Sequence, residues 1–580
     1  MGANRRKAHN DKMTEKEHEV DWLVAGAGAG GMTGAVVAHQ LGGSVLLVEK
    51  EAVYGGTTAK SGGVAWIPAN HRLPEFGIDD SSEDAYQYLH GLIGNSVPAP
   101  RIRAYAERAS EMLRFMMQHS HVHYTPLPAY MDYYDSVPGY QSGGRSMDPA
   151  PIHIRALGAA ASSMSRDHYT GLLLPFNVSV VEGRRLQEMD FGAYLLGARL
   201  AARYYLDLPA RLAKRGDDRL TLGPALVARL RRSLLDRDIP LWLNTPVAEL
   251  LYENGRVCGA RVTREGQPVT VRAKRGVLLC TGGFARNAGL RKQYQPQPSS
   301  DRWTAAAPGA TGDGIALGEK VDAALGFMGS AWWSPTYLLP DGRSLALISG
   351  KSNPGSIMVN RQGRRFTNEA QPYEDVVKDQ YASEQRGEGA VPCYLVFDAT
   401  FREKYTAGHI KPSKITPDSR LPQTYFENGL LSRANTLFEL GAQLGMDGHA
   451  LEQTVADFNH HARLGKDPLF GRGDSLHDRY YADPKVQPNP SLAPLEKGPY
   501  YALRCEPGDL DTKGGLLCNE HAQVLDRSGE VIPGLYAAGN ASAAVMGDTY
   551  PGAGSTIGSA MTFAYIAAQH ALGATAKESP

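Results

Sequence analysis

Cysteine, net charge and long apolar runs are all scarce in this 580-residue chain. Its five cysteines have spacings that match neither a CxxC metal site nor a disulfide framework, so we expect a reduced, cytoplasmic protein without a metal site. Sixty-one basic side chains balance 61 acidic ones, which gives no reason to expect a nucleic-acid partner. No apolar run reaches the roughly 18 residues of a membrane-spanning helix. These absences leave surface attachment to the inner face of the cell membrane open.

The N-terminal segment lacks the apolar stretch of a secretion signal. Its residues are mostly charged or polar, and we expect residues 1–19 to form a disordered tail. The folded chain is therefore expected to begin at Val20.

Glycine is abundant, with 64 residues grouped in short clusters. Residues 22–50 read as an apolar strand, a glycine turn, a small-residue helix and a second apolar strand. Gly26, Gly28 and Gly31 match the G-x-G-x-x-G pattern, which lets the backbone approach a pyrophosphate at a helix N-terminus. Glu49 ends the second strand, where a carboxylate can bind a ribose. The combination favours a dinucleotide site over a tight turn that only packs the helix.

Three further glycine clusters distinguish FAD from NAD. They are YGGTTAKSGGVAWIP at residues 54–68, RGVLLCTGGFARN at residues 275–287 and PGLYAAGNASA at residues 533–543. The last two are apolar strands that run into glycine. Glycine-rich segments so far apart in the sequence indicate a long ligand that distant parts of the chain contact. FAD fits that requirement better than NAD.

With PGDLDTKGGL at residues 507–516 and TYPGAGSTIG at residues 549–558, these segments resemble the flavoprotein family of fumarate reductases and succinate dehydrogenases. Within it, the combination is similar to the 3-ketosteroid Δ1-dehydrogenases. The resemblance extends from Val20 to about Ala571. It implies an α/β fold in which a Rossmann-like FAD-binding domain is interrupted by a smaller α+β substrate domain.

The resemblance also implies a set of cofactor-binding positions. FAD is expected to be noncovalent, because residues 55–63 lack the histidine that tethers flavin in succinate dehydrogenases. The implied FAD contacts are Gly26, Gly28, Ala29, Gly30, Gly31, Glu49, Lys50, Gly56, Thr57, Ser61, Gly62, Gly63, Val247, Thr281, Gly282, Gly539, Asn540, Ser555, Thr556 and Ile557.

A change in composition places the domain boundaries. The pattern of short glycine clusters between strands and helices stops near residue 326 and resumes near residue 497. We therefore expect the FAD-binding domain at residues 20–326 and 498–580, with the substrate domain at residues 327–497. Substrates in such architectures bind where the two domains meet.

The segment GDTYPGAGSTIG places a tyrosine in a glycine-rich loop that opens a helix. Gly552 and Gly554 allow positive φ, which lets the phenol of Tyr550 and the N–H of Gly554 converge on one point. The alternative is a tyrosine that only caps a strand-to-helix junction.

The Δ1-dehydrogenase resemblance assigns four catalytic positions. Tyr550 and Gly554 match the pair that holds the C3 carbonyl of the steroid, and Tyr373 matches the base that removes the C2 proton. Tyr133 matches the tyrosine that assists this base, although the adjacent Tyr134 leaves the register open by one residue. The implied reaction takes a 4-en-3-one to a 1,4-dien-3-one, with C1 hydride passing to flavin N5 and then to a quinone-like or dye acceptor.

The same segments disfavour one alternative function and leave two others open. Residues 548–552 lack the arginine with which fumarate reductases clamp carboxylates. A 3-ketosteroid Δ4-(5α)-dehydrogenase is a closer alternative, because it shares substrate class and cofactor. A flavoprotein that binds a membrane surface without its own substrate chemistry is the alternative of a different class.

An insertion at residues 150–216 is longer than compact relatives need. Its segment FGAYLLGARLAARYYLDLPARLAKR, residues 191–215, is basic and rich in apolar and aromatic residues. Arg199 and Arg203 share one helical face, and apolar residues gather largely elsewhere. Such a helix either lies on a membrane surface or packs on the FAD domain.

Overall fold

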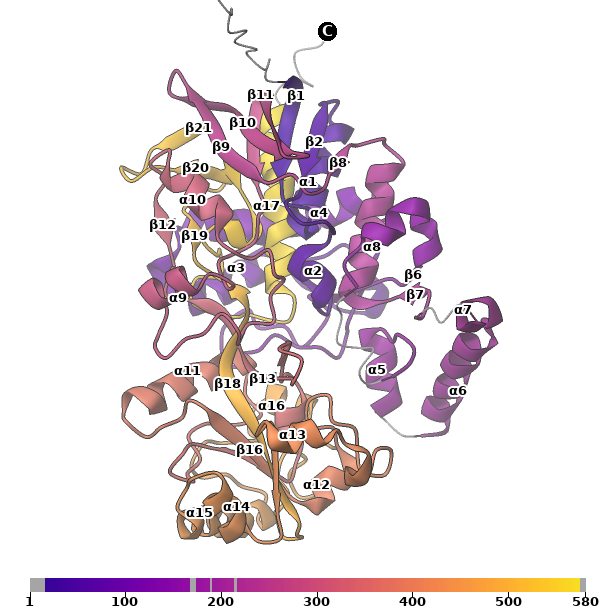
Figure 1. Ribbon diagram of the computed structural model, residues 1–580, viewed down its shortest axis with the longest axis vertical. Helices are drawn as coiled ribbons and strands as arrows, with labels where there is room; N and C mark the ends of the chain where they lie inside the picture. Colours follow the sequence, from indigo (N-terminus) through magenta and orange to yellow (C-terminus); the bar gives the residue numbers. More distant parts are fainter. Residues whose placement is uncertain (1–15, 167–173, 188–189, 213–215, 574–580) are drawn as a thin grey trace, which may run out of the picture.

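The computed structural model describes residues 16–166, 174–187, 190–212 and 216–573. Figure 1 shows two bodies stacked along the long axis, one built on the strands around β1 and the other on the strands around β16. The long strand β18 (Tyr500–Thr512) runs from one body into the other.

The larger body contains an eight-stranded sheet with the predicted strand–helix–strand unit at its centre. The main path is ordered β20 (Gln523–Leu525), β21 (Val531–Ala537), β11 (Gln267–Leu279), β1 (Lys16–Ala25), β2 (Val45–Val48) and β8 (Leu241–Trp242). Strands β21, β11, β1, β2 and β8 pair in parallel. β9 (Val247–Glu253) and β10 (Arg256–Arg264) extend β11 as an antiparallel flap. The predicted α/β fold is confirmed.

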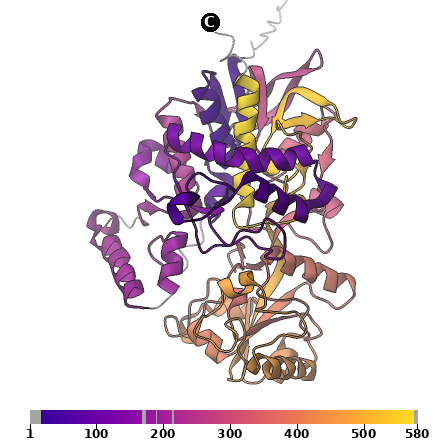
Figure 2. The ribbon, with the colours of Figure 1, turned by 180° about the vertical axis from the view of Figure 1, so that it is seen from behind.

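The two ends of the sequence meet on one face of this sheet. Helix α1 (Ala29–Gln40) packs against α17 (Ser555–Leu572), and the two lie side by side in Figures 1 and 2. Small residues make this approach possible: a Cβ at Gly30 would lie 3.2 Å from the carbonyl oxygen of Ala560 in α17. Helices α8 (Leu222–Leu235) and α4 (Ala99–His119) cover α1 and α17. The C-terminal segment therefore reaches the glycine turn at the N-terminus.

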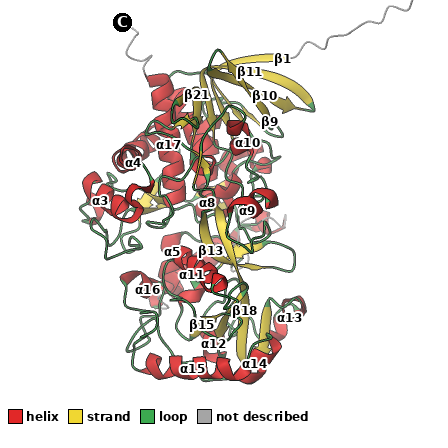
Figure 3. Cartoon of the chain, turned by 90° about the vertical axis from the view of Figure 1, so that its left-hand side faces the viewer, coloured by secondary structure: helices red, strands yellow, loops and turns green. Residues whose placement is uncertain are grey.

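The smaller body is built on a second, largely antiparallel sheet. Its strands are ordered β14 (Ser344–Ala346), β13 (Ala331–Leu338), β18, β16 (Cys393–Phe397) and β15 (Ser356–Val359), with β17 (Leu431–Ala434) paired to β18. Helix α11 (Tyr373–Gln385) packs on β13 and lies at the junction of the two bodies in Figure 3. Because β18 begins at Tyr500, this sheet continues past the expected boundary at residue 497. The division into two domains at residues 326 and 497 stays a prediction.

The remaining elements complete the two bodies. They are α2 (Gly56–Lys60), α3 (Ser82–Ile93), α9 (Ala288–Tyr294), α10 (Asp313–Glu319), α12 (Ala399–Lys404), α13 (Gln423–Glu427), α14 (Leu437–Gln443), α15 (Gly448–Arg463), α16 (Leu476–Tyr480), β3 (Ala65–Trp66), β4 (Tyr124–Pro126), β5 (Ser146–Pro149), β6 (Ile152–His153), β7 (Arg219–Leu220), β12 (Leu325–Gly326) and β19 (Gly515–Leu516).

One sequence prediction needs correction at the N-terminus. The disordered tail was expected to reach residue 19, but β1 begins at Lys16 and its first residue pairs with Val269. β11 is long enough to provide this partner, which a reading of local composition does not reveal. Residues 1–15 lie outside the described part of the chain.

The described residues of the insertion include three α-helices at the side of the molecule. They are α5 (Val180–Gln187), α6 (Phe191–Leu206) and α7 (Leu208–Leu212), and Figure 1 shows α6 and α7 standing away from both bodies. Within the described ranges, no helix has the length and apolar character needed to cross a membrane. Parts of the insertion, residues 167–173, 188–189 and 213–215, are not described.

Candidate active site

The first glycine turn is tightly packed on one side and open on the other. Gly26 has φ of +104°, and a Cβ there would lie 2.2 Å from the carbonyl oxygen of Cys280. A Cβ at Gly31 would lie 1.8 Å from the carbonyl oxygen of Gly26. At Gly28 the nearest heavy atom would be Thr58 Oγ1, at 3.7 Å. The turn thus requires glycine for packing and leaves open space at Gly28, where α1 begins, for a phosphate group.

Two predicted ligand residues follow at the end of β2. The Glu49 carboxylate accepts hydrogen bonds from the N–H groups of Ala27 at 2.9 Å and Glu51 at 3.0 Å. Burial raises the pKa of Glu49, while these bonds act in the opposite direction. Lys50 forms an ion pair with Asp313 at 2.7 Å. Glu49 is therefore held against the glycine turn, whereas the ammonium of Lys50 is already paired within the protein.

The other predicted cofactor positions lie at glycine turns and strand ends. Gly56, Gly63, Gly282 and Gly539 all have positive φ. Val247 is half-buried at the start of β9. The hydroxyl groups of three further predicted residues form hydrogen bonds within the protein: Thr57 accepts the Ala307 N–H, Ser61 donates to the Thr58 carbonyl and Thr281 accepts the Gly314 N–H.

Asn540, in the glycine segment at residues 533–543, is linked through Asp511 to the glycine segment at residues 275–287. Its side-chain N–H donates to Asp511 at 3.0 Å, and its oxygen accepts the indole N–H of Trp332 at 3.0 Å. Asp511 also accepts the N–H of Gly283 at 3.1 Å, and burial raises the pKa of Asp511 to about 6. Sequence reasoning did not single out Asp511 or Trp332. The acidic residues inside PGDLDTKGGL were a signal for Asp511, because a carboxylate that becomes buried needs hydrogen-bond partners.

Helix α17 presents free donors at its first turn. Gly554 caps the helix with φ of +94°, and a Cβ there would lie 2.5 Å from the carbonyl oxygen of Val64. Ser555, Thr556 and Ile557 form the first turn. The hydroxyl of Thr556 is buried and forms no hydrogen bond of normal geometry in the described part of the chain, although it lies near the Tyr550 hydroxyl and acts to lower its pKa. A buried hydroxyl without such a bond and a helix N-terminus fit a polar cofactor group at this place.

The two glycines of this loop are required for different reasons. Both allow positive φ, and of the two Gly554 takes it while Gly552 does not. Glycine is needed at position 552 because a Cβ would lie 2.6 Å from the indole nitrogen of Trp66. The close approach of Trp66 depends on tertiary packing and leaves no local sequence signal.

The structure brings the three predicted tyrosines together in one buried cluster. The ring centroids of Tyr373 and Tyr550 lie 5.2 Å apart, those of Tyr133 and Tyr550 lie 5.7 Å apart, and the Tyr133 hydroxyl donates to the Tyr373 hydroxyl at 3.3 Å. The Tyr133 N–H donates to the carbonyl of Pro551 at 2.9 Å, which fixes its loop to the Tyr550 loop. Tyr373 is the first residue of α11 and is buried.

The geometry also distinguishes Tyr133 from its neighbour. The Tyr134 hydroxyl donates to the Asp375 carboxylate at 3.0 Å, away from the Tyr373 hydroxyl that Tyr133 bonds. Of the two candidates, Tyr133 is therefore the residue in contact with Tyr373.

Burial dominates the electrostatics of this cluster. It raises the pKa of Tyr373 well above the usual value, and the hydrogen bond from Tyr133 acts weakly in the opposite direction. Burial also raises the pKa of Tyr550, while the hydroxyls of Tyr373 and Thr556 and, more weakly, the Gly554 N–H act in the opposite direction. The Gly554 N–H is thus one of several groups near the Tyr550 hydroxyl.

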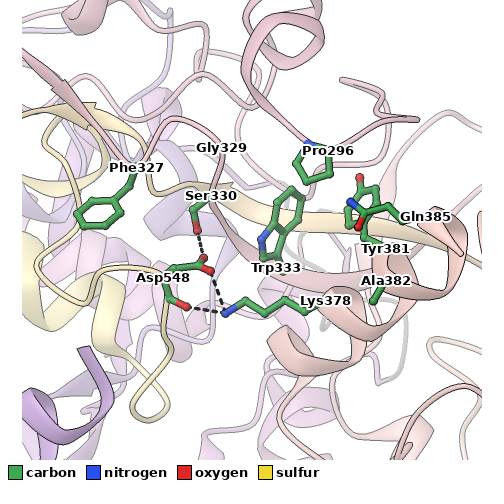
Figure 4. A pocket seen from close by; sticks show the side chains of 10 residues that line it. All are labelled: Pro296, Phe327, Gly329, Ser330, Trp333, Lys378, Tyr381, Ala382, Gln385 and Asp548. Atoms are coloured by element: carbon green, nitrogen blue, oxygen red, sulfur yellow. Dashed lines mark hydrogen bonds and ion pairs between the residues drawn. The ribbon is translucent and has the colours of Figure 1, made fainter. Parts of the chain in front are cut away.

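A separate cavity lies behind the Tyr550 loop. Its volume is about 390 Å³, and Figure 4 shows its wall, with Trp333, Lys378 and Asp548 in the centre. None of the three clustered tyrosines is among its lining residues. This cavity is therefore distinct from the tyrosine cluster, although Asp548 lies only two residues before Tyr550.

Comparisons with known proteins extend these observations. Residues 21–557 match the family model described as FAD binding domain. The chain is 40% identical over 574 residues to a 3-oxosteroid 1-dehydrogenase of Mycobacterium tuberculosis, covering 95% of this chain and 98% of that protein. It is 35% identical to a 4-oxocyclohex-2-ene-1-carboxylate 5-dehydrogenase of Sinomonas cyclohexanicum, covering 94% and 92%.

A solved structure gives the same result in three dimensions. The crystal structure of 3-ketosteroid delta1-dehydrogenase from Sterolibacterium denitrificans, in complex with 1,4-androstadiene-3,17-dione, superposes with a TM-score of 0.93 at 42% identity. The alignment covers 96% of this chain and 100% of that one. FAD is the cofactor that the family model, the open glycine turn and the free donors of α17 all fit. The chain is an FAD-dependent oxidoreductase and belongs to the family of the 3-oxosteroid 1-dehydrogenases.

Proposed function

We propose that this protein introduces a 1,2 double bond into 3-ketosteroids, taking a 4-en-3-one to a 1,4-dien-3-one. The observation that carries the proposal is the buried contact of Tyr133, Tyr373 and Tyr550 beside the Gly554 N–H. Such a site places a proton acceptor next to two donors. The names and identities of the relatives support a steroid ring ketone as the substrate class.

The chemistry requires these groups to act together. A C2–H bond beside a ketone becomes acidic only when the C3 oxygen is stabilised as it gains charge. Tyr550 and Gly554 would donate to that oxygen, and Tyr373 as the phenolate would take the C2 proton. Tyr133 donates to Tyr373 and so favours its ionised form.

The glycine turns and the first turn of α17 would hold FAD, which when bound supplies the acceptor for the hydride from C1. We propose noncovalent binding, because the segment at residues 55–63 offers no histidine for a tether. Acid denaturation should release the flavin into the supernatant. Flavin that stays in the protein precipitate would contradict noncovalent binding.

Steady-state turnover separates the proposed function from its alternatives. With a dye as electron acceptor, a 4-en-3-one steroid should be consumed and the new double bond should appear between C1 and C2. A 3-ketosteroid with a saturated A ring tests the Δ4-(5α) alternative, and 4-oxocyclohex-2-ene-1-carboxylate tests the substrate of the relative that is 35% identical. Turnover of the carboxylate alone would overturn the steroid proposal.

We further propose a quinone as the physiological class of acceptor, which a water-soluble quinone in place of the dye would test.

We also propose that the insertion contacts a membrane surface. The outer side of α6 and α7 is apolar: Phe191 is 83% exposed and Leu212 is 85% exposed. Tyr194, Leu195, Tyr205 and Leu206 are exposed beside them. Arg203, in contrast, is half-buried and pairs with Asp217 at 2.8 Å. The apolar stripe faces outward, which favours a lipid partner over packing on the FAD domain.

A further inference from the structure

A buried ion pair lies directly behind the tyrosine cluster. The Lys513 ammonium is 2.8 Å from the Glu374 carboxylate, and neither side chain is exposed. Lys513 also donates to the carbonyl of Thr549 at 2.7 Å. Glu374 directly follows Tyr373, and Thr549 directly precedes Tyr550. One ammonium therefore contacts the residue next to each of the two tyrosines.

The pair connects the two bodies of the molecule. Glu374 belongs to α11, which packs on the second sheet, whereas Thr549 precedes α17 in the larger body. Lys513 follows β18, the strand that runs between the bodies, and its backbone N–H donates to the carbonyl of Ser330 at 3.1 Å. Tyr373 and Tyr550 lie on different bodies, so their relative position depends on contacts that cross between them.

Lys513 also contacts the tyrosine site through an aromatic ring. Its ammonium lies 4.8 Å from the centre of the Trp332 ring. That ring meets Tyr550 edge-on, with centroids 5.0 Å apart, and its indole N–H donates to Asn540. The ammonium thus contacts the surroundings of Tyr550 from two sides, through the Thr549 carbonyl and through Trp332.

We propose that Lys513 and Glu374 are positioning residues that hold Tyr373 and Tyr550 in the relative placement that proton abstraction requires. The proposal rests on the proposed function, in which these tyrosines act on neighbouring atoms of one substrate. Neither residue touches the reacting atoms in this account. Their effect arises because a displacement of about 1 Å between reacting groups can cost about a hundredfold in rate.

A second lysine provides the matched control. Lys378 also contacts the Glu374 carboxylate, at 3.0 Å, but it is one-third exposed and lies in the wall of the cavity in Figure 4. It bonds Asp548, two residues before Tyr550, and makes no contact with Thr549 in the described structure. Removing Lys378 takes away a cation from the same carboxylate and a bond to the Asp548 carbonyl, but it leaves the bond from Lys513 to Thr549, next to Tyr550, in place.

The test compares five proteins loaded with FAD: the unmodified chain, Lys513→Met, Glu374→Gln, the double variant and Lys378→Met. The readouts are flavin content, steroid affinity and the rate at which a 4-en-3-one steroid bleaches the flavin without oxygen. The Lys513 and Glu374 variants should lose about a hundredfold in rate, with steroid affinity within about threefold of the unmodified chain. Lys378→Met should stay within about threefold in rate.

The double variant separates positioning from charge. It removes one cation and one anion, so any instability from a buried unpaired charge is relieved, yet the link to Thr549 is still lost. Its bleaching rate should remain low between about pH 7 and pH 10, whereas an effect of charge alone on Tyr373 would cancel and the rate would recover. Lys513→Arg keeps the charge and the donors and should recover part of the rate.

Two results would overturn the proposal. They are a rate for Lys513→Met within about threefold of the unmodified chain and a double variant that regains the full rate. A regained rate would mean that the pair tunes the charge of Tyr373 instead of its position. Failure of the proposed function itself is distinct, because the unmodified chain would then not be bleached at all.

Discussion

At the scale of single residues, the ionisation of Tyr373 is the controlling feature. Burial raises its pKa well above the usual value near 10, so only a small fraction is phenolate at neutral pH. Because the ionised form is the base, the bleaching rate should rise about tenfold per pH unit from pH 7 towards pH 10. Stopped-flow measurement of bleaching against pH checks this. A rate that is flat or falls over this range would contradict a tyrosine base.

The same burial limits the range of that experiment. Folding favours the neutral form of Tyr373, so its pKa is higher in the folded than in the unfolded state. Its contribution to stability is complete below the unfolded value near 10 and is lost as pH rises towards the folded value. The free energy of unfolding should therefore decrease above about pH 10, and a denaturant titration at each pH shows where the rate data stop being valid.

Replacing the base should abolish chemistry without disturbing the cofactor. Tyr373→Phe removes one hydroxyl from a buried ring, and we expect the bleaching rate to fall by about 10²–10⁴-fold with flavin content unchanged. Tyr134→Phe is the matched control, because that hydroxyl bonds Asp375 and not Tyr373. Retained bleaching in Tyr373→Phe, or an equal loss in Tyr134→Phe, would remove Tyr373 from this role.

Gly554 is expected to tolerate no side chain. Its φ of +94° is unfavourable for other residues by roughly 1–2 kcal/mol, and a Cβ would also meet the Val64 carbonyl. Gly554→Ala should therefore lower the thermal midpoint and move the N–H away from the Tyr550 hydroxyl, reducing the bleaching rate. Gly573→Ala, at the other end of α17 with φ of −68°, is the control and should leave both unchanged.

At the scale of elements, the parts with a local signal could be predicted. One short segment of sequence is enough to predict each of three features: the G-x-G-x-x-G turn, the strands that run into glycine and the helix after Gly554. What the sequence could not reveal depends on contacts between distant segments. The pairing of β18 with the second sheet, the burial of Tyr373 and the approach of Lys513 to Thr549 all require residues more than thirty positions apart to meet. The assigned roles of the tyrosines came from the family resemblance and stay a prediction.

Helix α6 carries a prediction of its own. We expect the unmodified protein to sediment with vesicles of phosphatidylcholine and phosphatidylglycerol, because its exposed apolar stripe can enter the interface. A Leu195→Glu, Leu206→Glu variant should lose at least about tenfold in binding. The control is Leu464→Glu, which changes an exposed leucine of the smaller body. A protein that stays in the supernatant, or an equal loss in the control, would contradict membrane contact by α6.

At the scale of the whole molecule, the reactive groups come from both bodies. Tyr373 lies on the helix that packs on the second sheet, whereas Tyr550 and Gly554 precede the C-terminal helix that packs on the first glycine turn. The proposed proton acceptor and the proposed carbonyl donors therefore meet only when the two bodies are in contact. This arrangement explains why the site draws on residues from positions 133 to 554 of the sequence.

The measurement that tests the central claim most directly is anaerobic mixing of the FAD-loaded protein with a 4-en-3-one steroid, without any electron acceptor. We predict that the visible flavin band disappears and that one 1,4-dien-3-one forms for each flavin reduced. A flavin that stays oxidised across a panel of such steroids, in a protein shown to bind FAD, would contradict the account.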